Sequence, residues 1–158
     1  MSVTINTTIN GTAVSASAEA STSLLEFLRD TLEMKGSKLC CNTGECGACT
    51  VIYNGKPINT CVTMAADAIG AQITTIEGLA DGDKLHPVQQ AFIDTGAVQC
   101  GYCTPGFIMS VKALLDRTTK PTPSDIEEAV SGNICRCTGY NKIVDAIHLA
   151  ADRIAGRA

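Results

Sequence analysis

Eight of the nine cysteines in this 158-residue chain fall into two groups of four. The first group has the spacing C-x4-C-x2-C followed by a distant fourth cysteine, and it consists of Cys41, Cys46, Cys49 and Cys61. This spacing is typical of plant-type ferredoxins, which bind a 2Fe-2S cluster through four thiolates. The second group combines C-x2-C with C-x-C and consists of Cys100, Cys103, Cys135 and Cys137. Two four-thiolate sites in so short a chain predict electron transfer.

Each group of four cysteines has to be weighed as a ligand set for an iron-sulfur cluster and for a zinc ion. A 2Fe-2S cluster needs two thiolates on each iron, so we expect Cys41 and Cys46 to share one iron and Cys49 and Cys61 to share the other. Structural zinc also uses four thiolates, but it commonly takes two short C-x2-C pairs, and the first group has one. The second group fits zinc as well as iron, so its spacing alone leaves both metals open.

Two residues beside these groups allow more than one role. Cys40 adjoins Cys41, and we expect it to be a small buried hydrophobe rather than an exchangeable ligand. Arg136 stands between the last two cysteines of the chain. Its charge either raises the potential of a nearby cluster or pairs with a carboxylate such as Asp145.

The histidines and tyrosines do not suggest a further site. His86 and His148 are too isolated for a Rieske-type centre, and we expect His148 to be packed or half-exposed. Tyr102 and Tyr140 are expected to pack and exclude water. The sequence contains no Ser/His/Asp arrangement, paired-carboxylate motif or phosphate-binding loop. We therefore expect the chain to carry electrons without performing bond chemistry itself.

Composition narrows the class of protein further. The net charge is -4 and the twelve Lys and Arg residues form no basic run, which argues against nucleic-acid binding and a polybasic membrane anchor. No apolar stretch approaches the roughly 20 residues that span a bilayer, and residues 1–5 do not resemble a secretory signal. We expect a cytoplasmic protein without membrane insertion. Thiols stay reduced there, so a dense cysteine set favours metal binding over disulfides.

The first half of the chain predicts a helix packed on a mixed sheet. A hairpin is expected over residues 3–18 with its turn at Asn10-Gly11, followed by a helix that a capping box at Ser23 begins. That helix carries Leu24, Leu28 and Leu32 on one face. Further strands are expected at 50–53, 58–62 and 72–76, and the first cysteine group occupies the loop before them. This is a ferredoxin-like β-grasp arrangement.

The second half has helical periodicity almost throughout. Residues 80–84 are polar and turn-rich, so they are the expected boundary between domains 1–79 and 84–158. Four helices are expected: one through Val88 and Phe92, one that Thr104 caps, one that starts near Thr122, and a last one through Ile143 and Ile147. The overall fold class is therefore α+β, with a β-grasp domain followed by an all-α four-helix bundle.

Three motifs together resemble a known family. Residues 44–51, 99–106 and 132–140 read GECGACTV, QCGYCTPG and GNICRCTGY. They are similar to the signatures of the iron-sulfur subunit of molybdenum hydroxylases, the xanthine oxidase family. That family includes aldehyde oxidoreductases, carbon monoxide dehydrogenase and 4-hydroxybenzoyl-CoA reductase. The resemblance extends over essentially the whole chain, with one departure at Cys40, where the family usually has glycine.

The resemblance implies a function and partners. It implies a flavin-side cluster in the first domain and a molybdenum-side cluster in the second, with Gln99 and Cys137 touching the pterin of the molybdenum cofactor. Gln99 also fits an ordinary surface position. The implied partners are a large molybdenum-cofactor subunit and a medium FAD subunit, assembled as a dimer of heterotrimers. Electrons would leave molybdenum one at a time through the second cluster and then the first. A free-standing two-cluster ferredoxin and a zinc-binding interaction protein are the alternatives.

Overall fold

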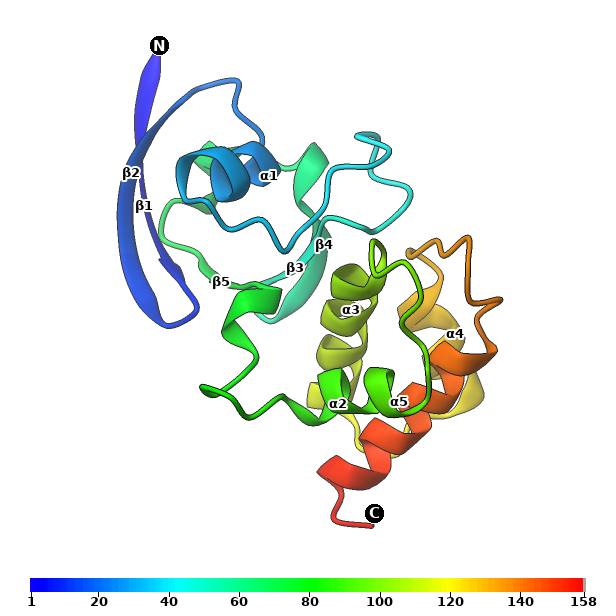
Figure 1. Cartoon of the computed structure of the whole chain (residues 1–158). Coiled ribbons are helices and arrows are strands. Elements are labelled where there is room, and N and C mark those ends of the chain that lie inside the picture. The colour runs from blue at the N-terminus through cyan, green and yellow to red at the C-terminus, as the bar shows by residue number, and fades with distance from the viewer. Residues whose placement is uncertain (158) are drawn as a thin grey trace.

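The computed structural model describes residues 1–157, which form a sheet-containing half and a helical half (Figure 1). The sheet has five strands: β1 (Ser2–Ile9), β2 (Thr12–Glu19), β3 (Thr50–Tyr53), β4 (Lys56–Asn59) and β5 (Gln72–Thr74). The strand order is β2-β1-β5-β3-β4. β1 and β5 are parallel, whereas the other neighbouring pairs are antiparallel. The predicted β-grasp fold with a mixed sheet is confirmed.

The predicted first helix is confirmed, but it is shorter and wider than an ordinary α-helix. It comprises one α-turn, α1 (Leu24–Glu26), and a π-helical turn, Phe27–Thr31. The N–H of Leu32 donates to the carbonyl of Phe27 at 3.1 Å, five residues back, which produces the wider turn. The predicted leucine face still holds, because Leu24 and Leu28 are fully buried against the sheet.

The predicted capping box at the start of α1 is present in full. Ser23 Oγ accepts a hydrogen bond from the Glu26 N–H at 3.2 Å, and Glu26 Oε2 accepts one from the Ser23 N–H at 2.8 Å. The hydrogen bonds from the Ser23 backbone and side chain hold the pKa of Glu26 below its ordinary value. This contribution to stability is present above the ordinary pKa of a glutamate and is lost as the pH falls through the lowered value.

Replacing Ser23 with alanine is expected to cost about 1 kcal/mol of stability, because the N-cap acceptor is lost. In a protein of this size that loss lowers the melting temperature by roughly 2–4 °C. The same change is expected to raise the pKa of Glu26 toward its ordinary value, which an NMR titration of the Glu26 carboxyl group measures. Ser21→Ala is a suitable control, since Ser21 lies outside the capping box. An unchanged Glu26 pKa in Ser23→Ala would contradict the assigned hydrogen bonds.

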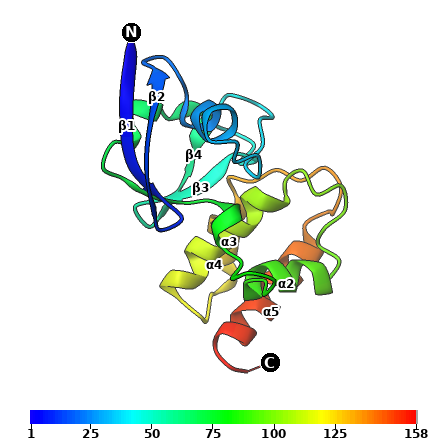
Figure 2. The same cartoon turned by 60° about the vertical axis from the view of Figure 1, so that its left-hand side comes forward.

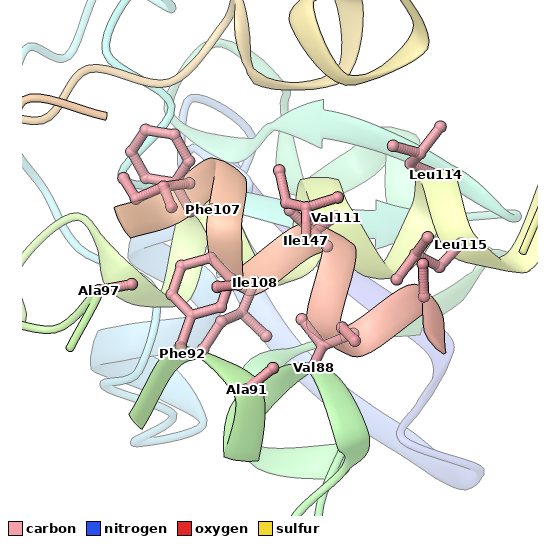
Figure 3. Packing of buried hydrophobic residues seen from close by; sticks show 14 of the residues in the cluster. Val88, Ala91, Phe92, Ala97, Phe107, Ile108, Val111, Leu114, Leu115 and Ile147 are labelled. Carbon is pink, nitrogen blue, oxygen red and sulfur yellow. The ribbon is translucent and has the colours of Figure 1, made fainter. Parts of the chain in front are cut away.

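The second half contains the four predicted helices: α2 (Pro87–Asp94), α3 (Thr104–Arg117), α4 (Pro123–Val130) and α5 (Asn141–Ile154). Their apolar faces meet in one core, shown in Figure 3, where Phe92, Phe107 and Ile147 are fully buried. α4 starts at Thr122 as predicted, and Thr122 caps it through a capping box with Asp125. The prediction that Thr104 caps α3 is wrong by one residue, because the N-cap is Cys103 and Thr104 is the first helical residue.

The two halves are in direct contact. Figures 1 and 2 show α3 as the helix of the helical half that lies nearest the sheet, and it packs against β3. Side chains alternate along β3, so Val51 points into the sheet-side core while Ile52 packs with Met109 and Ala113 of α3. The domain limits 1–79 and 84–158 remain predictions. Within residues 1–157, none of the helices has the length and apolar character that crossing a membrane requires.

Candidate metal centres

The loop between α1 and β3 carries three cysteines of the first group. Backbone N–H groups of Thr43 and Cys46 each donate to Cys41 Sγ at 3.4 Å. Gly44 and Gly47 have φ angles of +80° and +66°, a left-handed conformation that glycine adopts without a steric penalty. The tight turns at these glycines aim the N–H donors at sulfur.

The fourth cysteine of this group approaches from the sheet. Cys61 lies on the 3-10 turn Thr60–Val62 that follows β4, so the prediction that it lies within a strand over 58–62 is wrong. The chain leaves the strand because Thr60 is buried and its hydroxyl donates to the carbonyl of Cys49 at 2.8 Å. This hydrogen bond ties Cys61 to the end of the metal loop.

The pKa values of the cysteines in the first group reflect hydrogen bonds, burial and neighbouring thiols. Hydrogen bonds from the side chain and backbone of Thr43, and from the Cys46 N–H, lower the pKa of Cys41 to about 5. Burial and the adjacent Cys49 thiol raise the pKa of Cys61 to about 11. Burial also raises the pKa of Cys46, with the neighbouring Cys41 adding to the effect. The sulfurs of this group therefore approach as Cys41 with Cys46 and Cys49 with Cys61.

The second group gathers at the ends of helices. Cys103 is the N-cap of α3, and Cys135 lies in the segment that joins α4 to α5. Cys137 Sγ donates to Cys100 Sγ at 3.7 Å, so these two residues form one pair. Burial, followed by the nearby Cys135 thiol, raises the pKa of Cys103 to about 12, which identifies the other pair.

Thr138 supports the sulfur of Cys135. Its Oγ1 donates to Cys135 Sγ at 3.1 Å and its N–H donates to the same sulfur at 3.4 Å. Burial opposes ionisation of Cys135, but these hydrogen bonds lower its pKa nevertheless. Tyr140 adds a contact, because its hydroxyl accepts the N–H of Cys135 at 3.1 Å. The prediction that Tyr140 is only a packing group therefore missed this polar role, for which the sequence carries no signal.

One side of the second group faces outward. Cys100 and Cys137 are exposed, whereas Cys135 is buried and Cys103 is half-buried. Gln99, which the resemblance places against the pterin, is also exposed and adjoins Cys100. The outward pair and Gln99 thus share an accessible edge.

Cys40 and Arg136, the two residues beside the cysteine groups, both lie at the surface. None of the nine cysteines, all of which lie within residues 1–157, forms a disulfide. Cys40 is exposed, so the prediction that it is buried is wrong; it sits in a loop that projects both Leu39 and Cys40 to the surface. Asp145 pairs with Lys142 at 3.5 Å rather than with Arg136, and Arg136 is exposed.

The two histidines and Tyr102 have roles that do not involve the cysteine sulfurs. His86 is the N-cap of α2, where its Nδ1 accepts the N–H of Val88 at 3.2 Å. His148 is exposed rather than packed or half-exposed. Tyr102 donates a hydrogen bond to the carbonyl of Leu39. Across residues 1–157, no three His, Cys, Asp or Glu side chains converge on a single metal-ion position.

Comparison with known proteins assigns both halves of the chain to families. Residues 7–70 match the 2Fe-2S iron-sulfur cluster binding domain, and residues 75–148 match a second family described as a 2Fe-2S binding domain. The chain is 49% identical over 153 residues to the nicotinate dehydrogenase small FeS subunit of Eubacterium barkeri, covering 97% of this chain and 98% of that protein.

Solved structures agree with these matches. The fold superposes on quinoline 2-oxidoreductase from Pseudomonas putida 86 with a TM-score of 0.92 and 37% identity, covering 99% of both chains. It also superposes on the aldehyde oxidoreductase from Desulfovibrio gigas with a TM-score of 0.94 and 43% identity. There it covers 99% of this chain but 18% of the other, so the same unit forms part of a longer polypeptide.

These findings define the class of protein. An α+β chain with two successive 2Fe-2S domains is an electron-transfer module. The chain belongs to the family of small iron-sulfur subunits of the molybdenum hydroxylases, a family of oxidoreductases.

Proposed function

We propose that each cysteine group holds one 2Fe-2S cluster through its four thiolates. The first cluster would be bound by Cys41, Cys46, Cys49 and Cys61, and the second by Cys100, Cys103, Cys135 and Cys137. The residues fit such a group: the sulfurs approach in two pairs per site, and backbone N–H groups point at Cys41 and Cys135. When bound, a 2Fe-2S cluster supplies a one-electron carrier.

We propose further that the chain carries electrons between a large molybdenum-cofactor subunit and a medium FAD subunit, in a dimer of heterotrimers. The observation that carries this proposal is the near full-length likeness to a small FeS subunit of a dehydrogenase. The outward pair of the second group supports it, since an exposed sulfur and Gln99 together offer a contact for a neighbouring cofactor. In this arrangement Gln99 and Cys137 face the pterin, and the first group faces the flavin side.

Purification of the tagged chain from the cells that encode it tests the proposal. We expect a large and a medium chain to co-purify, with molybdenum and FAD in amounts comparable to the tagged chain. The substrate-binding residues would lie on the large chain. A chain that elutes alone with its iron, without molybdenum or flavin, would instead establish a free-standing two-cluster ferredoxin.

Replacing Thr138 with valine is expected to lower the reduction potential of the second cluster. The hydroxyl donates to Cys135 Sγ at 3.1 Å, and hydrogen bonds to sulfur stabilise the reduced, more negative state. If that bond is worth about 1 kcal/mol more in the reduced state, the potential falls by roughly 40 mV in a one-electron couple. A redox titration followed by electron paramagnetic resonance (EPR) measures both clusters in one sample. The first cluster is the internal control, and an equal shift in both would contradict the assignment.

A further inference from the structure

The first metal loop, which carries Cys41, Cys46 and Cys49, is in direct contact with the second metal loop, which carries Cys135 and Cys137. The backbone N–H of Ile134 donates to the carbonyl of Cys46 at 3.0 Å. Cys46 belongs to the first cysteine group, and Ile134 immediately precedes Cys135 of the second. A single hydrogen bond therefore joins the backbones of the two groups across the boundary between the halves.

The buried side chain of Asn133 stabilises this contact between the two loops. Its side chain is 4% exposed, its Nδ2 donates to the carbonyl of Gly47 at 3.0 Å, and its Oδ1 accepts the hydroxyl of Ser110 at 2.7 Å. Its own N–H donates to the carbonyl of Val130 at 2.9 Å. The side-chain amide thus connects the first metal loop with α3, and both of its ends are hydrogen-bonded, while the backbone N–H of the same residue connects to the end of α4.

The junction leaves no spare room around Asn133. A Cβ atom added at Gly47 would lie 2.3 Å from Asn133 Nδ2 and 2.3 Å from the carbonyl oxygen of Gly132. A Cβ atom added at Gly106 would lie 2.1 Å from the carbonyl oxygen of Gly47. The backbones of the first metal loop and of α3 are therefore in contact, and a displacement of either one meets backbone atoms of the other.

We propose that Asn133 is a positioning residue that fixes the distance and orientation between the two metal centres, and so governs electron passage between them, although it binds neither. This proposal rests on the proposed function as a two-cluster carrier. Buried hydrogen bonds add only about 1 kcal/mol each to stability, but they specify one arrangement, because a displaced partner leaves a buried polar atom unsatisfied. The apolar contact between the halves, Ile52 against Met109 and Ala113, has no comparable directionality.

A role in positioning the two metal centres has consequences that differ from a loss of protein stability. Asn133 is not a cysteine and its amide is hydrogen-bonded to Gly47 and Ser110, so its replacement leaves both sets of four cysteines in the sequence. Loss of its two side-chain hydrogen bonds removes the link between Asn133 and the carbonyl of Gly47, which adjoins Cys46 and still accepts the N–H and the hydroxyl of Thr50. The expected consequence is a change in the relation between the centres while each centre keeps its own properties.

The test compares Asn133→Leu with Thr7→Val in the full chain, isolated anaerobically with its iron. Leucine has nearly the shape of asparagine but makes neither hydrogen bond. Thr7→Val is the matched control, because it removes one buried hydrogen bond, from Thr7 Oγ1 to the carbonyl of Ala71 at 2.9 Å, inside the sheet-side half. The readout is the magnetic interaction between the two reduced clusters in EPR spectra, which falls with the cube of their distance.

In Asn133→Leu we expect the interaction splitting to be lost or broadened, with the g-values and potentials of the separate clusters unchanged. Thr7→Val is expected to keep the wild-type splitting. Ser110→Ala removes one partner of Asn133 by a milder change, and it decides the matter if Asn133→Leu does not load iron. Wild-type splitting in the variant that loads iron would overturn the inference alone. Absence of both cluster signals from the wild-type chain would overturn the proposed function.

Discussion

Replacing Cys41 with alanine is expected to remove two of the four iron atoms that two 2Fe-2S clusters place on each chain. Cys41 has the lowered pKa of its pair and receives the N–H groups of Thr43 and Cys46, so it is the thiolate that the first loop is built to present. In the proposed arrangement, one iron would then have a single protein ligand. Iron and acid-labile sulfide analysis is expected to fall to half, and one of two EPR signals is expected to disappear.

Cys40→Ala is the matched control for this change. Cys40 adjoins Cys41 in the sequence but is exposed, and a one-residue shift would turn C-x4-C into C-x5-C. We expect Cys40→Ala to retain all the iron and both signals. Loss of iron from Cys40→Ala with full iron in Cys41→Ala would show that the ligand is Cys40 and that the loop geometry has been misassigned.

Replacing Gly106 with alanine is expected to destabilise the protein, against the usual effect of alanine in a helix. In α3 the gain in helix propensity alone would be about 1 kcal/mol. The new methyl group would lie 2.1 Å from the carbonyl oxygen of Gly47, which is backbone and cannot rotate away. Overpacking of this kind costs about 1–3 kcal/mol or more, so we expect the apparent melting temperature of the iron-loaded protein to fall by several degrees.

Gly132→Ala is the control for the glycine prediction. A Cβ atom at Gly132 meets nothing within 4 Å, and the residue does not have a positive φ angle. Alanine there restricts the unfolded chain without a clash, so stability is expected to stay the same or rise slightly. An equal fall in melting temperature for both variants, or a rise for Gly106→Ala, would contradict the close contact between α3 and the first metal loop.

Much of the fold follows from local signals in the sequence. The Asn10-Gly11 turn, the capping boxes at Ser23 and Thr122, and the alternation along β1 each involve residues within a few positions of one another. Errors occur where distant contacts decide the backbone. The strand before Cys61 ends early because Thr60 bonds to the carbonyl of Cys49, and no local pattern reports that contact.

The sulfur groups were predictable for a related reason. Cluster-binding thiols follow fixed spacings, and glycines such as Gly44 and Gly47 reveal the turns that these spacings require. The supporting residues were not predictable, because Thr138 and Asn133 are ordinary polar residues until the fold brings them against Cys135 and Gly47. The exposure of Cys40 was missed for the same reason, since burial depends on the path of the whole loop.

The arrangement of the two halves explains how one short chain serves two centres. Each half has its own apolar core, and the core of the helical half includes Cys135, with Cys103 packed against it. The halves meet where Ile134 donates to the carbonyl of Cys46, so the groups adjoin without sharing a ligand. One group keeps an exposed pair, Cys100 and Cys137, which the proposed function places toward a neighbouring subunit.

Quantitative iron and acid-labile sulfide analysis of the anaerobically isolated chain, combined with EPR after reduction, decides whether the chain holds two 2Fe-2S clusters. We expect four iron and four sulfide per chain and two distinct signals, since the chain has two 2Fe-2S domains. Zinc in place of iron, with no labile sulfide and no signal, would contradict it.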